Sequence, residues 1–416
     1  MAFLGSIYKA QERAHKRGGS QVTALIQNSK RKLNDFVGTY LIGEEEIKEV
    51  LEVLEAQSLF RYYGPNLLEK VTQFEEEIAN FMGSKYSLAV NSGTSALKAA
   101  LIAIGIKAGD EVIVPAYGFF ATASAVVSCQ ATPVFVDINH SMNLDPDKLD
   151  LYVTEYTRAI IVVHIQGVSA QMDRIKQIAN HHHLYLIEDV AQAFSGEFSS
   201  KKLGTIGDIG CFSFQANKIL VTGEGGAIIT DNENLYLKAK SFHDLGGVRK
   251  KNEFPCWDNE DASFGENFRM SELNAAVGIA QIKKIPLLLE KLKHLKRELR
   301  YLLIANGFKV RDVHDQEGDC SISECVFIED EESRDFLIEW LNSKEVHAHG
   351  MYHHAIYEYN VFNKLKDINK NYKSFSCINA ENLARRALWI PISPMSDDDY
   401  IKHVIQVLIE AKADFK

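Results

Sequence analysis

One lysine lies where its amine could do chemistry. Lys218 follows an apolar stretch that ends at Phe214, and it precedes the glycine-rich turn of residues 223–226. Its position in the interior of a domain makes water scarce around it, and removing an ammonium group from water costs several kcal/mol unless its pKa falls. A lysine so placed is a candidate for a Schiff base with a carbonyl compound.

A carboxylate and an amide follow a second apolar stretch, residues 184–187. Asp189 stands at its end and Gln192 comes three residues later. At the end of a strand, both side chains can point into the same crevice, where Asp189 would pair with a cation and Gln192 would hydrogen-bond an oxygen. The alternative for Asp189 is an ordinary helix N-cap.

A short polar turn, residues 91–95, follows the apolar residues 87–90 and opens a helix. Free backbone amides and the helix dipole make such a turn an anion site. Gly93 lets the backbone approach a ligand closely, and Thr94 adds a hydroxyl. A helix cap without a ligand is the alternative, because Ser and Thr cap most helices for structural reasons.

The elements that hold these residues alternate between strands and helices. Expected strands cover residues 87–90, 111–115, 133–137, 159–164 and 184–189, and expected helices cover residues 95–104, 121–127 and 171–181. Continuous apolar strands between helices are typical of a parallel sheet covered on both faces. Ligands of such sheets bind at the carboxyl ends of the strands, which is where the residues above stand.

Composition excludes several classes of protein. The 416 residues carry a formal net charge of −10, which argues against nucleic-acid binding. No apolar run approaches the roughly 20 residues of a membrane helix. Six cysteines are scattered along the chain, which is typical of reduced thiols in a cytoplasmic protein. Cys320 and Cys325 lack a second pair for a zinc site, so we expect no metal.

In combination, the motifs resemble those of the pyridoxal-phosphate-dependent sugar aminotransferases of the DegT/DnrJ/EryC1/StrS family. The resemblance runs from about residue 37 to the C-terminus, and the motifs stand in the family's order. They are residues 92–94, 115–119, 188–192, 213–218, 223–226 and 265–270.

The resemblance implies an α/β architecture of fold type I, similar to aspartate aminotransferase. It implies a mainly parallel seven-stranded sheet and a smaller α+β C-terminal domain. We expect an N-terminal extension at residues 1–36, a large cofactor-binding domain at residues 37–285 and a small domain at residues 286–416. The extension is basic, and we interpret it as a segment that packs on its own or on a partner subunit.

Roles at the cofactor follow from the same resemblance. Lys218 matches the lysine that holds pyridoxal 5′-phosphate as a Schiff base and moves the proton during transfer. Asp189 matches the acid that pairs with the pyridinium nitrogen and keeps the ring protonated. Gln192 matches the residue beside the phenolic oxygen, and Phe119 matches the aromatic ring that stacks on the pyridine.

The phosphate would be held by Gly93, Thr94 and Ser213. Asn267 matches an asparagine that the family brings from the neighbouring subunit, which implies a homodimer with shared active sites. Arg269 is either a ligand for the carboxylate of the amino donor or part of an interface ion pair.

Three further residues are candidates for contact with the substrate. Tyr352 and His354 belong to a region that faces the sugar in the family. His164 ends an expected strand and could line the site, with a purely structural role as the alternative.

The implied reaction moves an amino group from L-glutamate or glutamine to a keto-sugar, most commonly nucleotide-activated, in amino-sugar, surface-polysaccharide or natural-product biosynthesis. Residues 59–64 also resemble a branch that aminates an oxidised eight-carbon acid sugar similar to Kdo, which is one alternative. A non-catalytic regulatory relative is another. A nicotinamide-dependent dehydratase or epimerase is disfavoured, because no early G-x-G-x-x-G is present.

Overall fold

The computed structural model describes residues 36–249, 253–362, 364 and 375–414. The expected N-terminal extension lies outside this part of the chain, apart from Phe36. Among the described residues, no helix combines the length and the apolar character needed to cross a bilayer.

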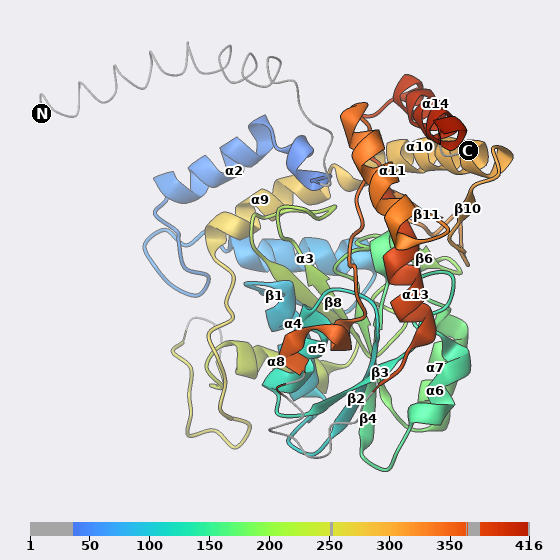
Figure 1. Cartoon of the computed structure of the whole chain (residues 1–416). Coiled ribbons are helices and arrows are strands. Elements are labelled where there is room, and N and C mark those ends of the chain that lie inside the picture. The colour runs from blue at the N-terminus through green and yellow to red at the C-terminus, as the bar shows by residue number, and fades with distance from the viewer. Residues whose placement is uncertain (1–35, 250–252, 363, 365–374, 415–416) are drawn as a thin grey trace, which may run out of the picture. The chain divides into compact units, whose positions relative to one another are not determined.

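A seven-stranded sheet has the order β1-β9-β8-β5-β4-β2-β3 (Figure 1). Its strands are β1 (Tyr86–Val90), β2 (Glu111–Pro115), β3 (Thr132–Val136), β4 (Thr157–Val163), β5 (Tyr185–Asp189), β8 (Ile209–Ser213) and β9 (Gly226–Thr230). Neighbouring strands are parallel except where β9 pairs with β1 and β8. The prediction of a mainly parallel seven-stranded sheet is confirmed.

Helices cover both faces of this sheet, because successive strand side chains point to opposite sides. Leu88 and Val90 belong to one buried core, while Ala89 between them belongs to the other. The core that holds Ala89 includes α3 (Lys70–Met82), α7 (Met172–His181), α9 (Glu272–Ile282) and α10 (Ile285–Ala305). The other core includes α4 (Gly93–Ala103), α5 (Ala121–Ser128), α8 (Glu233–His243) and α13 (Ile378–Arg386).

A smaller antiparallel sheet follows α10, as the α+β prediction requires. It has the order β10-β11-β12 and consists of β10 (Lys309–Val310), β11 (Ser323–Phe327) and β12 (Ala387–Pro391). Helices α11 (Glu331–Ser343) and α14 (Asp398–Asp414) accompany it. The core that holds Ala89 continues into α10 and α14, so the division at residues 285 and 286 stays a prediction.

Shorter elements complete the described chain. They are α2 (Glu44–Glu55), α6 (Pro146–Leu149), the hairpin β6 (Glu197–Phe198) and β7 (Lys201–Lys202), and the 3-10 turns η1 (Gly38–Leu41), η2 (Asp150–Tyr152), η3 (Ile165–Gly167) and η4 (Ile356–Glu358). Among them, η1 and η3 matter most for function, because both contact the residues that follow the carboxyl ends of the large sheet.

Candidate active site

Two adjoining cavities open at the carboxyl ends of the parallel strands. The first has a volume of about 120 Å³, and the second has a volume of about 230 Å³. They share Phe119, Ala191, Gln192, Gln215 and Lys218. The first also reaches Gly93, Thr94, Thr122, Asp189 and Ser213, and the second also reaches Gln166, His349, Met351 and Tyr352. Predicted residues from four separate motifs, together with Tyr352, therefore surround two adjoining cavities.

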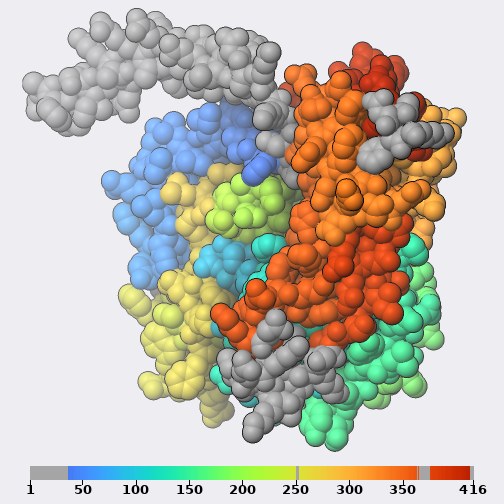
Figure 2. All heavy atoms as spheres, viewed as in Figure 1, coloured from blue at the N-terminus to red at the C-terminus, as the bar shows by residue number. Residues whose placement is uncertain are grey.

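Lys218 lies in the loop between β8 and β9 and is held by its backbone. Its N–H donates to the carbonyl of Gln215 at 2.9 Å, and its own carbonyl accepts from the N–H of Gly38 at 2.9 Å. A Cβ at Gly38 would lie 2.5 Å from the carbonyl oxygen of Ile219, so only glycine permits this approach. Figure 2 shows the lime-green loop at the surface, between the blue start of the described chain and the orange C-terminal part.

The amine of Lys218 is partly buried. Burial lowers the pKa of Lys218 from its ordinary value, although the nearby carboxylate of Asp189 opposes this change. A lysine with a lowered pKa carries more neutral amine at a given pH, and the neutral amine is the form that attacks a carbonyl.

Asp189 ends β5 with a carboxylate that is 5% exposed. Its Oδ2 accepts from the hydroxyl of Thr122 at 2.8 Å, and its Oδ1 accepts from the N–H of Ala191 at 3.1 Å. Burial raises the pKa of Asp189 despite these two hydrogen bonds. The carboxylate is thus fixed in orientation and short of positive charge, which suits it to pair with a cationic ring nitrogen.

Glu188 points to the opposite face of the same strand and has a structural role. Its carboxylate accepts from the backbone N–H groups of Gly204, Ile206 and Gly207 at 2.6 to 2.8 Å. The fourth donor is Nε2 of His164, at 3.1 Å from Oε2. These contacts bind the turn that precedes β8 to the end of β5.

His164 is fully buried behind this carboxylate and lines neither cavity. Its Nδ1 accepts from the N–H of Ala170 at 3.2 Å, so the ring proton is on Nε2 and is donated to Glu188. Both ring nitrogens of His164 are therefore engaged within the protein. This placement favours the purely structural role over contact with the substrate.

The amide of Gln192 has a defined orientation. Its Oε1 accepts from the N–H of Gln166 at 3.0 Å, and its Nε2 donates to the hydroxyl of Tyr352 at 3.3 Å. The donor end of the amide therefore points toward Tyr352 at the wall of the second cavity, and Gln192 itself lines both cavities.

An anion cradle lies at the start of α4. Ser92 caps the helix by accepting from the N–H of Ser95 at 3.1 Å, while the first helical N–H groups have no partner within the helix. A Cβ at Gly93 would lie 2.7 Å from Cβ of Ser213, so glycine is required where α4 meets the end of β8. Gly93, Thr94 and Ser213 all line the first cavity.

Two aromatic side chains stand at the cavity walls. The ring of Phe119 is 58% exposed and lines both cavities, so one face is open to a ligand. Tyr352 lines the second cavity and contacts the ring of Tyr117 edge-on at 5.4 Å between centroids. His354 is exposed, packs against Tyr359 and lines neither cavity.

Asn267 and Arg269 lie outside both cavities within one chain. Asn267 is exposed. Arg269 donates through a terminal guanidinium nitrogen to Oδ1 of Asp244 at 2.6 Å, and Arg249 donates to Oδ2 at 2.7 Å. Burial favours a higher pKa for Asp244, but the two arginines outweigh it and lower that pKa. The ion pair is therefore present, and contact of Arg269 with an amino donor stays a prediction.

Sequence reasoning missed several residues of the site. Thr122, Gln166 and His349 line the cavities, yet each stands in a stretch without a distinctive motif. Gln215 also lines both cavities and belongs to the motif at residues 213–218, but it was assigned no role. Gln215 offered a weak signal, because it lies three residues before Lys218 in the same loop. Within the described residues, no cluster of three or more His, Cys, Asp or Glu side chains could hold a metal ion.

Comparison with known proteins identifies this arrangement. Residues 41–409 match the DegT/DnrJ/EryC1/StrS aminotransferase family. The chain belongs to this family. It is therefore a pyridoxal-phosphate-dependent aminotransferase.

Individual members of the DegT/DnrJ/EryC1/StrS family resemble the chain over much of its length. The spore coat polysaccharide biosynthesis protein SpsC of Bacillus subtilis is 36% identical over 387 residues, which are 88% of this chain and 94% of SpsC. GDP-perosamine synthase of Caulobacter vibrioides is 41% identical over 217 residues, 52% of this chain and 57% of the synthase. NtdA from Bacillus subtilis, solved with bound cofactor PMP, superposes with a TM-score of 0.78 and 27% identity, covering 92% of this chain and 86% of NtdA.

The cavity residues fit the cofactor of this DegT/DnrJ/EryC1/StrS chain. A glycine cradle at a helix start suits the phosphate, the buried carboxylate of Asp189 suits the ring nitrogen, and Lys218, whose pKa is lowered by burial, lines the same cavity. When bound, pyridoxal phosphate supplies an electron-accepting ring for amino transfer. The chain's own contribution would be to orient that ring and to hold the proton at Nζ of Lys218.

Thr122→Val should weaken the binding of pyridoxal phosphate about tenfold, because Asp189 loses the hydroxyl donor that fixes its Oδ2. Thr122→Ser keeps the hydroxyl and is the matched control. Titration of the apoproteins with pyridoxal phosphate, followed by fluorescence, measures both dissociation constants. Equal affinity of the valine variant and the wild type would show that Thr122 does not orient Asp189.

Covalent attachment of pyridoxal phosphate should depend on pH through the neutral amine of Lys218. Because burial lowers the pKa of Lys218, the attachment rate should reach half its maximum below the ordinary lysine value of about 10.4. Asp189→Asn removes the charge that opposes this lowering, so its midpoint should lie at still lower pH. Stopped-flow absorbance, from about pH 6 to about pH 11, measures both midpoints. A midpoint at or above that of Nα-acetyl-lysine would contradict the expectation.

Proposed function

We propose that the chain transfers an amino group from L-glutamate or glutamine to a nucleotide-activated keto-sugar. The observation that carries this proposal is the convergence of Lys218, Asp189 and the Gly93 cradle on one cavity. The product would be an amino sugar for a surface polysaccharide or a related natural product. The names of SpsC and GDP-perosamine synthase support this class of acceptor.

The second cavity suits the hydroxyl-rich sugar part of the acceptor. Its polar walls include Gln166, Gln215, Asn217 and Tyr352, which can exchange hydrogen bonds with sugar hydroxyls. Lys218 is the one lysine or arginine that lines either site cavity within the described ranges. An acid sugar would require a further cation for its carboxylate.

The segment that suggested an acid-sugar substrate is engaged elsewhere. Arg61 is buried and donates both to Glu75, at 2.8 and 3.0 Å, and to the carbonyl of Ala89 at 3.1 Å. The hydroxyl of Tyr62 contacts Nε2 of His243 at 3.2 Å. Since these contacts account for Arg61 and Tyr62 as structural residues, we keep a keto-sugar without a carboxylate as the proposed acceptor.

We also propose a homodimer in which Asn267 completes the site of the partner subunit. Asn267 is exposed and outside its own cavities, although the family's motif assigns it to the phosphate. In a homodimer, Asn267 of one subunit could reach the phosphate cradle of the other subunit.

Adding L-glutamate to the holoprotein should move its visible absorption band into the near ultraviolet, because the amino group passes to the cofactor. Lys218→Ala should lower the overall transfer rate at least about 10³-fold while leaving the thermal unfolding midpoint of the apoprotein nearly unchanged. A visible band that ignores both glutamate and glutamine would overturn the proposed donors. Full turnover of the alanine variant would overturn the role of Lys218.

Mixed dimers should test the shared site. Lys218→Ala and Asn267→Ala homodimers should each be inactive or nearly so, whereas remixing the two variants should restore about a quarter of wild-type activity through one intact site per mixed dimer. Sedimentation velocity provides the control that the variants remain dimeric. Absence of any recovery after demonstrated subunit exchange would contradict the shared site.

A further inference from the structure

Gln166 occupies an unusual place between the active site and the small sheet. It lies in η3, directly after β4, with φ 49° and ψ 46°. This left-handed conformation is uncommon for a residue with a side chain, and such residues persist where their surroundings fix them. The contacts of Gln166 explain why this conformation is stable and what the residue does beside Gln192.

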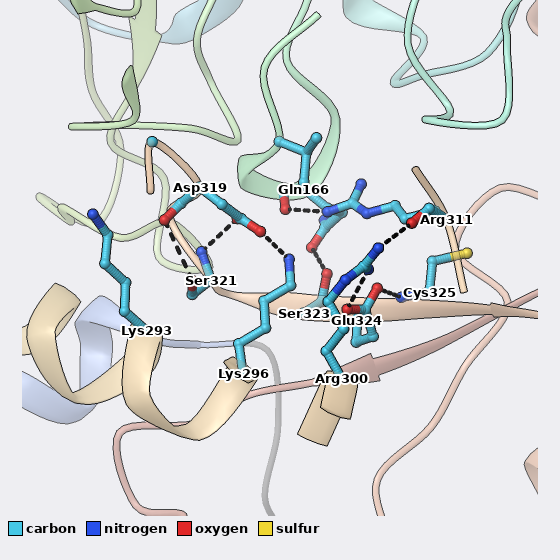
Figure 3. A network of polar contacts seen from close by, with 12 residues as sticks. Gln166, Lys293, Lys296, Arg300, Arg311, Asp319, Ser321, Ser323, Glu324 and Cys325 are labelled. Atoms are coloured by element: carbon cyan, nitrogen blue, oxygen red, sulfur yellow. Dashed lines mark hydrogen bonds and ion pairs between the residues drawn. The ribbon is translucent and has the colours of Figure 1, made fainter. Parts of the chain in front are cut away.

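The backbone of η3 is fixed by an arginine that lies 145 residues after Gln166 in the sequence. Arg311 follows β10, is fully buried and packs over the ring of Trp389 at 4.9 Å. Its two terminal nitrogens donate to the carbonyls of Ile165 at 2.8 Å and Gln166 at 2.9 Å. Figure 3 shows this fork reaching from the small sheet to Gln166. A planar guanidinium can hold two successive carbonyls in one geometry.

The side chain of Gln166 is fixed as well. Its Oε1 accepts from the hydroxyl of Ser323 at 3.0 Å (Figure 3). This leaves its Nε2 to donate to Oε1 of Gln192 at 3.4 Å and to Sδ of Met351 at 3.4 Å. The hydroxyl of Ser323 can donate or accept, so it holds the Gln166 side chain in place, while the orientation of both amides follows from the backbone N–H of Gln166, which makes Oε1 of Gln192 the acceptor.

Oε1 of Gln192 thus receives two donors from one residue, the N–H and the Nε2 of Gln166. An amide that turned its Nε2 toward these donors would lose both hydrogen bonds and place three donors together. We propose that Gln166 is a positioning residue, which directs the Nε2 donor of Gln192 toward the ligand oxygen in the shared cavity. This inference rests on the proposed function, in which that oxygen is the phenolic oxygen of the cofactor.

The orientation of Gln192 has a measurable chemical effect. A donor at the phenolic oxygen withdraws negative charge from it, which weakens the hold of that oxygen on the proton shared with the Lys218 nitrogen. Loss of the donor should therefore raise the pH at which the visible band of the holoprotein titrates. The titratable residues that line the two cavities with Gln192, namely Tyr352, Asp189, Lys218, His349 and Glu224, are the same in every variant below.

The experiment compares the pH midpoint of the visible band in four holoprotein variants with that of the wild type. Gln192→Leu removes the donor and should raise the midpoint by about half to one pH unit. Gln166→Leu leaves the backbone N–H in place, so it should raise the midpoint by a smaller amount, about 0.4 pH unit. Ser323→Ala frees the Gln166 amide and should shift the midpoint in the same direction.

Gln130→Leu is the matched control. Gln130 is also a glutamine with positive φ, 61°, but it is exposed and lines neither cavity, so this variant should titrate like the wild type. Its thermal unfolding midpoint also measures the cost of leucine in a left-handed conformation, which separates stability from the spectroscopic effect.

The outcomes separate the inference from the function on which it rests. A wild-type midpoint for both Gln166→Leu and Ser323→Ala, with a raised midpoint for Gln192→Leu, would overturn the positioning role and leave the proposed function intact. An unchanged midpoint for Gln192→Leu would overturn the contact with the phenolic oxygen and the inference together. A wild-type protein that forms no visible band with pyridoxal phosphate would overturn the proposed function itself.

Discussion

The buried carboxylate of Asp189 is the constraint on which the site depends. Burial raises its pKa, so the ionised form is unfavourable until a positive charge faces it. The fold nevertheless holds this carboxylate in one orientation, through Thr122 from α5 and the N–H of Ala191. A cationic ring bound beside Asp189 would stabilise its ionised carboxylate. The free energy that burial of this charge costs in the unliganded protein would then contribute to affinity for the cofactor.

Glu188, the residue before Asp189 on β5, has a structural role and faces away from the site. Glu188 and Asp189 point to opposite faces of β5 because side chains alternate along a strand. Glu188 is satisfied by three backbone donors and by His164, none of which lines either cavity of the site. The fully satisfied acid binds the turn before β8 to β5, and this attachment fixes the strand from which the loop of Lys218 departs. One dipeptide thus supplies a rigid support and a reactive group.

The sequence predicts the strands and the motif residues well, because both depend on local patterns. Apolar runs mark β1 and β5, and the polar residues at their carboxyl ends mark that edge of the sheet. Thr122 and Gln166 could not be found in this way, because their partners are distant along the chain. Thr122 meets Asp189 across 67 residues, and Arg311 meets the carbonyl of Gln166 across 145 residues. Only the folded chain brings such pairs together.

The segment that carries Asn267 is held in place by contacts within its own chain, which bears on the proposed dimer. Asn267 and Arg269 belong to a segment that pairs by isolated bridges with Asp244 and Val90, next to the end of β1. Asp244 also binds Arg249, so this exposed segment is already rigid in one chain. Phe254, Trp257 and Phe264 lie exposed in the preceding stretch, and exposed apolar rings of this kind are typical of a contact surface. A rigid segment loses little conformational freedom on association, so a second copy could receive Asn267 in its phosphate cradle without first ordering the residues that carry it.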